Sequence, residues 1–303
     1  MGDAPADHAA VRLLGPAEIR DLAELLGIQP TKKLGQNFVI DANTVRRIVR
    51  IADVRTGQTA VEIGPGLGSL TLGLLEAGAR VIAVEIDRRL AEQLPRTIGD
   101  FAPGAELTVV AADAMTVTSL DPAPSVLVAN LPYNISVPVL LHFLEHFASI
   151  SSGVVMVQAE VGQRLAAVPG SKIYGGPSAK AAWYGDFRLA GNVSRQVFWP
   201  VPNVDSVLVA FTRHEPLGTD SERQATFALI DAAFGQRRKM LRQALGGVLG
   251  DAGAASVRIE AAGIAPTARG EELTVADFLA IARAGDAGEP REPGEPSGPG
   301  EPE

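Results

Sequence analysis

Four consecutive residues near the middle of the chain have side chains suited to one particular chemistry: Asn130, Leu131, Pro132 and Tyr133. The Asn side chain offers a carbonyl oxygen, and the rigid Leu-Pro link directs a backbone carbonyl beside it. Two such acceptors can take both hydrogens of an exocyclic amino group, while the Tyr ring offers a flat face on which a nucleobase can stack. The motif predicts an enzyme that methylates the amino group of a nucleobase. A turn with a packed Tyr is the simpler alternative.

The motif contains no acid or base, and this fits the predicted chemistry. The amino nitrogen of adenine is a poor nucleophile because its lone pair is delocalised into the ring. Two acceptors on its N–H groups favour a more tetrahedral nitrogen, and a sulfonium group is an excellent leaving group. The reaction then needs alignment and electrostatic stabilisation more than it needs a strong base.

A glycine-rich loop lies upstream of this motif. Gly64, Gly66 and Gly68 follow an apolar, strand-like run over 59–63 and precede a predicted helix. Glycines at such a turn let the backbone approach a ligand at the carboxyl ends of the strands. The pattern alone is weak evidence, because a tight strand-to-helix turn without a ligand explains it equally well.

Two acids at the next strand ends favour a nucleoside-containing cofactor. Glu85 ends the second predicted strand, where a carboxylate can accept both ribose hydroxyls, and Asp113 follows the third, where it can accept from an adenine amino group. The loop lacks the Lys of a phosphate-binding loop, and Ser69 replaces the third glycine of a dinucleotide fingerprint. Glu62 would face a pyrophosphate badly but suits a cation. These residues favour S-adenosylmethionine over ATP or NAD.

The elements that position these residues follow from the hydrophobic pattern. Apolar runs alternate with helical stretches along much of the chain, which predicts an α/β fold with a Rossmann-like, mainly parallel sheet. From about Glu215 only helical patterns remain, so a small all-helical C-terminal domain is expected. Asp41 is predicted to cap a helix that runs through Ala52. The predicted strands cover 59–63, 80–86, 107–111, 125–129, 154–158, 187–191 and 205–212, and the other predicted helices cover 17–27, 69–77, 88–98, 138–147, 160–167, 222–234, 237–248, 254–262 and 274–284.

Composition sets the domain boundaries that we expect. The chain has 303 residues, is 46% hydrophobic and contains no cysteine, so it can form a packed core but no disulfide or thiolate metal site. We predict a flexible N-terminus over 1–16, a methyltransferase domain over 17–213, a helical domain over 214–284, and a disordered, acidic, Pro-rich tail over 285–303. We assign the tail no role.

The net charge of −8 does not exclude a nucleic-acid partner, because the C-terminal tail alone carries six acids and one Arg. Local basic clusters matter more than the sum. The uncharged run Pro122–Leu144 contains four prolines, so a strand, a loop and a helix explain it better than a membrane span. Residues 1–8 lack the pattern of a secretory signal, and we expect a cytoplasmic protein without membrane contact.

The chain closely resembles the small-subunit ribosomal RNA adenine dimethyltransferases over about residues 17–284. The loop, the two acids and the Asn130–Tyr133 motif match that family's cofactor and catalytic motifs. The further matching stretches are 32–39, 169–175, 198–206 and 234–239. The last two are the most specific, because a generic methyltransferase would lack them.

This resemblance implies two methyl transfers to each of two adjacent adenines in a hairpin near the 3′ end of small-subunit rRNA. It implies S-adenosylmethionine as the cofactor, immature small ribosomal subunits as the partner, no metal, and a monomer. Tyr133 and Phe198 would sandwich the adenine, with Asn130, Leu131 and Pro132 at the amino group. The implied cofactor contacts are Asn37, Val39, Gly64, Gly66, Gly68, Glu85, Ile86, Asp113, Ala114 and Asn130. Asn203 departs from the Lys that family members often carry, and Val39 from the more usual Leu.

Basic residues gather in two places that are candidates for RNA phosphate contact. One group is Arg237, Arg238, Lys239 and Arg242, which we expect to open a helix of the C-terminal domain; the other begins at Lys32 and Lys33 and continues with Arg46, Arg47 and Arg50. Solvated helix faces are the alternative explanation of both.

A pair of histidines on a predicted helix also matches a known metal-binding pattern. His142 to His146 matches a metalloprotease pattern, but we expect this helix to cover the sheet rather than to bind metal.

Three other functions are alternatives. The nearest is a large-subunit adenine methyltransferase of the drug-resistance type, against which the 198–206 and 234–239 stretches argue. A non-catalytic assembly or transcription factor on the same fold is the second rival. A NAD oxidoreductase is the third, and Ser69 argues against it.

Overall fold

The computed structural model describes residues 10–28, 37–132 and 135–286. The chain divides into two compact units, residues 1–216 and 217–303, which are described separately.

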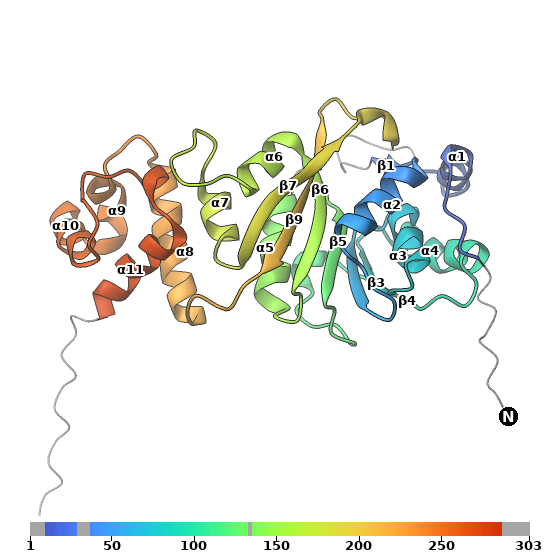
Figure 1. The fold of residues 1–303 in the computed structure, drawn as a ribbon, viewed down its shortest axis with the longest axis horizontal. Coiled ribbons are helices and arrows are strands. Elements are labelled where there is room, and N and C mark those ends of the chain that lie inside the picture. Colours follow the sequence, from blue (N-terminus) through green and yellow to red (C-terminus); the bar gives the residue numbers. More distant parts are fainter. Residues whose placement is uncertain (1–9, 29–36, 133–134, 287–303) are drawn as a thin grey trace, which may run out of the picture. The chain divides into compact units, whose positions relative to one another are not determined.

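The first unit is built on one seven-stranded sheet with strand order β4-β3-β2-β5-β6-β9-β7 (Figure 1). The first five of these strands run parallel, while β9 is antiparallel to both of its neighbours. The predicted Rossmann-like, mainly parallel sheet is confirmed. The strands are β2 (Thr59–Ile63), β3 (Arg80–Glu85), β4 (Leu107–Ala111), β5 (Val126–Asn130), β6 (Ser152–Gln158), β7 (Gly185–Val193) and β9 (Ser206–Arg213).

Helices cover both faces of this sheet, as buried parallel strands require. Val126 and Val128 of β5 belong to the core that the sheet shares with α2, α3 and α4, whereas α6 contacts β6, β7 and β9 on the other side (Figure 1). The helices of this unit are α1 (Pro16–Leu25), α2 (Ala42–Ile51), α3 (Ser69–Glu76), α4 (Arg88–Phe101), α5 (Ser136–His146), α6 (Ala159–Leu165) and α7 (Gly176–Ala181). Asp41 caps α2 as predicted, since its side chain accepts from the Thr44 backbone N–H.

Two short segments outside the predicted strands pair with each other. β1 (Phe38–Val39) and β8 (Phe198–Trp199) form a separate two-stranded antiparallel ribbon, with Phe38 opposite Trp199 and Val39 opposite Phe198. The Phe38 and Trp199 rings stack with their centroids 6.4 Å apart. This long-range pairing brings together two of the stretches that match the family.

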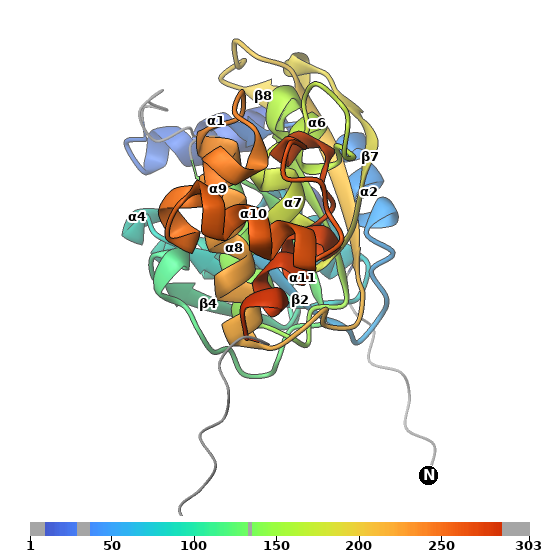
Figure 2. The ribbon, with the colours of Figure 1, turned by 90° about the vertical axis from the view of Figure 1, so that its left-hand side faces the viewer.

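The second unit is the predicted all-helical domain (Figure 2). It contains α8 (Asp220–Gly235), α9 (Leu241–Leu249), α10 (Ala252–Ala261) and α11 (Val275–Asp286). Thr219 and Glu222 form a capping box at the start of α8. The predicted helix over 237–248 starts later, because α8 ends at Gly235 and Met240 is the extended residue that precedes α9.

Candidate cofactor and base site

A pocket of about 340 Å³ lies where the parallel strands of the first unit end. β2, β3, β4 and β5 all run in the same direction, so the residues that follow them meet at one edge of the sheet. The volume suits a small ligand. The pocket is lined by Asn37, Phe38, Val39, Glu62, Ile63, Gly64, Pro65, Gly66, Leu67, Ser69, Leu70, Val84, Glu85, Ile86, Asp87, Leu90, Ala112, Asp113, Ala114, Asn130, Leu131, Pro132 and Ile135.

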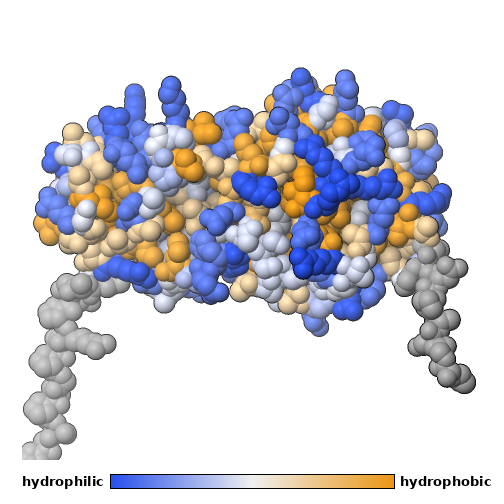
Figure 3. All heavy atoms as spheres, viewed as in Figure 1, coloured by the Kyte–Doolittle hydropathy of each residue, from blue (hydrophilic) through white to orange (hydrophobic). Residues whose placement is uncertain are grey.

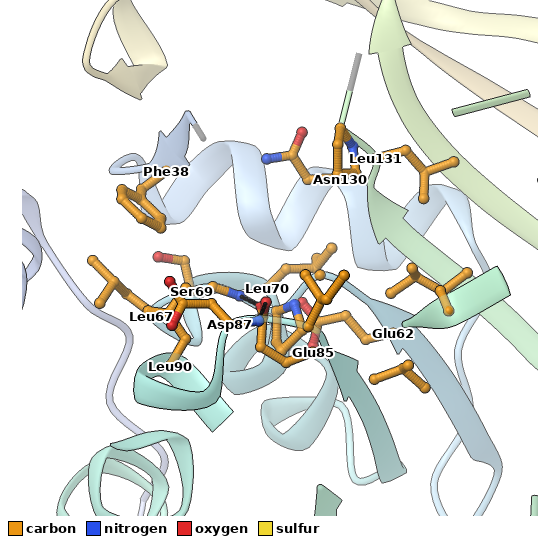
Figure 4. Close-up of a pocket in the computed structure, with 18 of the residues that line it drawn as sticks. Phe38, Glu62, Leu67, Ser69, Leu70, Glu85, Asp87, Leu90, Asn130 and Leu131 are labelled. Carbon is orange, nitrogen blue, oxygen red and sulfur yellow. Dashed lines mark hydrogen bonds between the residues drawn. The ribbon is translucent and has the colours of Figure 1, made fainter. Parts of the chain in front are cut away.

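The pocket has two sides that differ in construction (Figure 4). We call the glycine loop with Glu62, Glu85 and Asp87 the floor. We call the extended segment over residues 37–40 the entry strap, and the strap together with Asn130 the roof. Phe38 and Asn130 lie across the pocket from Glu85 and Asp87 in this view.

The glycine loop of the floor adopts backbone angles that favour glycine. Gly64 and Gly66 have φ values of +69° and +57°, and both line the pocket. A Cβ on Gly66 would lie 2.9 Å from the Phe38 ring, so the roof approaches the loop closely there. Gly68, by contrast, is not in the pocket wall. It precedes α3 with φ +98°, and a Cβ at this position would lie 2.8 Å from the Leu94 side chain, so glycine is needed there. Its predicted contact with the cofactor stays a prediction.

Glu85 holds the floor in shape. Its side-chain oxygens accept from the backbone N–H groups of Gly66, at 3.1 Å, and Asp87, at 2.9 Å. The residue is 6% exposed, and burial raises the pKa of its carboxyl group although the two backbone hydrogen bonds oppose that shift. One carboxylate therefore links the loop after β2 to the end of β3. The predicted contact with ribose hydroxyls stays a prediction.

Glu62 is the most deeply buried acid of the pocket wall, with 1% of its surface exposed. Thr71 donates a hydrogen bond of 2.6 Å to its Oε2. Burial is the main cause that raises its pKa to about 8, and the nearby Glu85 adds to the shift while the Thr71 hydrogen bond opposes it. A cation in the pocket would favour the ionised form. This acid is therefore placed to respond to a positively charged ligand.

Asp113 follows β4 and is exposed at the edge of the pocket. Its Oδ1 accepts from the Met115 backbone N–H at 2.9 Å, which fixes the side chain at the start of a short helical turn. Ile86 and Ala114 also line the pocket, and Ile86 is 70% exposed. An exposed apolar side chain beside an acid suits the flat face and the polar edge of a purine.

Asn130 ends β5 and is oriented by the entry strap. Its Nδ2 donates to the backbone carbonyl of Asn37 at 3.0 Å. Because the donor end of the amide is used in this way, the carbonyl end is directed elsewhere and can accept a hydrogen bond. Leu131 and Pro132 continue the same wall. Three of the four residues of the predicted catalytic motif thus border the pocket, and Tyr133 lies outside the described residues.

The comparisons with known proteins agree on one family. Residues 28–285 match the model of the ribosomal RNA adenine dimethylase family. This chain belongs to that family.

The relatives are similar along nearly their whole length. The chain is 70% identical over 276 residues to the ribosomal RNA small subunit methyltransferase A of Leifsonia xyli subsp. xyli, covering 90% of this chain and 98% of that protein. It is 61% identical to the protein of the same name from Streptomyces griseus over 89% of this chain and 94% of that one. A Plasmodium falciparum dimethyladenosine transferase structure shares the fold, with a TM-score of 0.70, 23% identity, and coverage of 82% of this chain and 98% of that one. The predicted family, methyltransferase activity and fold are confirmed.

Phe198 pairs with Val39 of the pocket wall but does not itself line the pocket. Phe198 is 1% exposed, belongs to the hydrophobic core through β8, and does not line the pocket. The predicted stacking of this ring on the adenine stays a prediction. Trp199, the neighbouring residue, is half-buried.

The sequence interpretation missed several residues of the pocket wall. Phe38 lies over Gly66, and Ser69 and Leu67 follow in the loop and the first turn of α3. Phe38 stands between Asn37 and Val39, both of which were predicted to contact the cofactor. Its position between them could therefore have indicated that it also lines the pocket. Nothing in the sequence around Ser69 indicated that its Oγ would donate to the Val39 carbonyl, which it does at 2.7 Å.

The basic residues predicted to contact RNA divide into paired and exposed ones. Arg237 forms an ion pair with Glu271 at 2.8 Å. Arg238 and Lys239 are exposed and Arg242 is half-buried. These residues, apart from Arg242, lie in the connection between α8 and α9 and do not open a helix, which corrects the prediction. Lys32 and Lys33 lie outside the described residues.

The arginines of α2 are partly engaged as well. Arg46 binds Glu76 through two hydrogen bonds of 2.9 Å, and Arg47 donates to the Asn192 carbonyl at 2.9 Å. Arg50 is exposed. Figure 3 shows a strongly hydrophilic surface over α2. The α2 face therefore has fewer uncommitted charges than the sequence cluster indicated.

The histidine pattern on α5 has a structural use. Nε2 of His142 lies 2.8 Å from the Val117 carbonyl, and the His142 and His146 rings contact each other. Among the described residues, no group of three or more His, Asp or Glu side chains is arranged to hold a metal ion. No helix within the described part of the chain is long and apolar enough to cross a membrane.

Proposed function

We propose that this chain transfers methyl groups from S-adenosylmethionine to the N6 amino groups of two adjacent adenines in a hairpin near the 3′ end of small-subunit rRNA. The observation that carries the proposal is the orientation of Asn130. Its donor end is held by the Asn37 carbonyl at the rim of a pocket that Glu62, Glu85 and Asp113 line. An acceptor for an amino group therefore stands beside a pocket suited to a cationic nucleoside.

The pocket residues fit this cofactor. Glu85 would accept from the ribose hydroxyls, Asp113 from the adenine amino group, and Ile86 would cover the adenine face. Gly64 and Gly66 leave room for the backbone to approach the ligand, and the buried Glu62 lies where a cation would stabilise its ionised form. When bound, the cofactor supplies a methyl group on a sulfonium that needs no further activation.

The chain's own contribution is alignment. The Asn130 carbonyl and the backbone carbonyl of the Leu-Pro link would accept the two N6 hydrogens, which turns the nitrogen lone pair toward the cofactor. Tyr133 would stack on the extruded base and repay part of the few kcal/mol that extrusion costs. No side chain need act as a strong base, because the amino group loses its proton after the methyl group has been transferred.

The small-subunit substrate is favoured over the large-subunit one by the relatives. The proteins that are 61–70% identical carry small-subunit names. The structural likeness to the 23S rRNA methyltransferase ErmE, with 24% identity and a TM-score of 0.61, covers 82% of this chain and all of that one, and it concerns the fold alone. We further propose that Arg238 and Lys239 contact rRNA phosphates, and that the chain acts as a monomer in the cytoplasm.

The test is methyl transfer from labelled S-adenosylmethionine to immature small subunits, followed by mapping of the label. We expect two adjacent adenines near the 3′ end to be labelled, with none in mature small subunits or in large subunits. Label in large-subunit rRNA would support the drug-resistance activity instead. Binding to immature subunits without any label would support a non-catalytic assembly factor.

A further inference from the structure

The entry strap is held at two alternate carbonyls, by one side chain at the end of β5 and one in the first turn of α3. Asn130, at the end of β5, donates to the Asn37 carbonyl, and Ser69, in the first turn after the β2 loop, donates to the Val39 carbonyl. In an extended chain the carbonyls of residues i and i+2 point to the same side. Both hydrogen bonds therefore fix one face of the same short segment.

The hydrogen bond from Ser69 is well placed to control the segment. Ser69 is 7% exposed, and its Oγ lies 2.7 Å from the Val39 oxygen in a buried bond. On its outer side the strap is tied to the ribbon partner, since the Ile40 N–H donates to the Val197 carbonyl at 2.8 Å. Between these hydrogen bonds the Phe38 ring lies over Gly66. A small rotation of the strap would therefore change both the shape of the pocket and the direction of the Asn37 carbonyl.

We infer that Ser69 is a positioning residue for methyl transfer. Its hydroxyl holds the entry strap against the first turn of α3, and the strap in turn holds the Asn130 amide in the orientation that presents its carbonyl to the substrate amino group. This inference rests on the proposed function. Ser69 does not act on the amino group itself, because its hydroxyl is used by the Val39 carbonyl.

The test compares three variants of the full-length chain. Ser69→Ala removes the hydroxyl, and Ser69→Thr keeps it. Ser149→Ala is the matched control, because Ser149 makes the same kind of hydrogen bond, also 2.7 Å long, to the Pro124 carbonyl. Pro124 lies in the loop before β5 and Ser149 in the loop before β6, so this hydrogen bond is at the amino ends of the strands, away from the pocket.

Two independent measurements are needed. Hydrogen–deuterium exchange of residues 38–40, measured without rRNA, reports whether the strap is held. Single-turnover methylation of immature subunits at saturating cofactor reports whether Asn130 is oriented. We expect Ser69→Ala to speed exchange of the strap and to slow methyl transfer about three- to tenfold, as one lost hydrogen bond implies. Ser69→Thr should restore both values, and Ser149→Ala should change neither.

The inference is overturned if Ser69→Ala methylates at the wild-type rate, or if its rate falls while exchange of residues 38–40 stays unchanged. A wild-type chain that transfers no methyl group to any subunit would instead refute the proposed function. The exchange measurement would still decide in that case whether Ser69 holds the strap.

Discussion

The floor and the roof of the pocket are made in different ways. The floor consists of residues close in sequence to the ends of β2 and β3, and its acids bind backbone N–H groups or a neighbouring hydroxyl. The roof is assembled from residues 37–40 and Asn130, which meet through a long-range hydrogen bond, and the strap also pairs with β8. Under the proposed function, the floor would bind the cofactor and the separately built roof would align the reacting group.

The largest expected effect concerns Phe198, which the structure places in the core. Phe198→Ala should lower the free energy of unfolding by about 3–5 kcal/mol, the usual cost of truncating a buried Phe. Chemical denaturation would measure it. Phe198→Leu is the control that sharpens the comparison, since it largely refills the core and removes the aromatic face. A stable Phe198→Leu variant with strongly reduced methylation would support the predicted base-stacking role of this ring.

Asn130→Ala should give the largest effect on chemistry. The loss of an acceptor aligned with the transferring group should slow single-turnover methylation by about 10²–10³, by analogy with the removal of one preorganised hydrogen-bonding group. Stability should change little, because the residue is half-buried at a strand end. A near-wild-type rate at saturating cofactor would remove Asn130 from the chemistry and leave the roof as a cover only.

The raised pKa of Glu62, on the floor of the pocket, predicts that cofactor affinity depends on pH. With its pKa raised to about 8, this acid is largely protonated at neutral pH and must lose its proton to pair with a cation. Affinity for S-adenosylmethionine should therefore rise with pH, by up to about tenfold per unit below pH 8. Calorimetry in two buffers would detect the released proton. Glu62→Gln should flatten the dependence, and an unchanged pH profile in that variant would contradict the assignment.

The same shift has a consequence for stability, with a definite sign. The pKa of Glu62 is about 8 in the folded chain against 4.5 for an unperturbed Glu, so the folded state binds the extra proton between these pH values. The free energy of unfolding should thus decrease as pH rises through that window, and less so in Glu62→Gln.

The smallest expected effect lies in the helical unit. Arg238→Ala with Lys239→Ala should weaken rRNA binding and reduce the slope of log affinity against log salt by about one for each lost phosphate contact. Arg237→Ala is the matched control, because Arg237 is paired with Glu271 and should change the slope less. Equal slopes for the double variant and the wild type would exclude these residues from the interface.

The sequence predicted the floor better than the roof. Strand ends, glycines and acids follow one another along the chain, so local patterns located Glu85 and Asp113 at one edge of the sheet. The roof depends on pairing between segments that are far apart, such as Val39 with Phe198, and two-residue strands leave no periodic pattern. The sequence could not show that Leu94 leaves no room for a side chain at Gly68, because that contact joins the loop to another helix.

The division between floor and roof is tested most directly by Glu85→Ala and Asn130→Ala in the same experiment. Single-turnover methylation of immature small subunits would be measured over a range of S-adenosylmethionine concentrations. We expect Glu85→Ala to weaken cofactor binding by about 1–3 kcal/mol, the cost of lost hydrogen bonds to a charged group, and to recover most of its rate at saturation. Asn130→Ala should stay slow at every concentration. A rate that saturating cofactor restores in Asn130→Ala but not in Glu85→Ala would contradict the account.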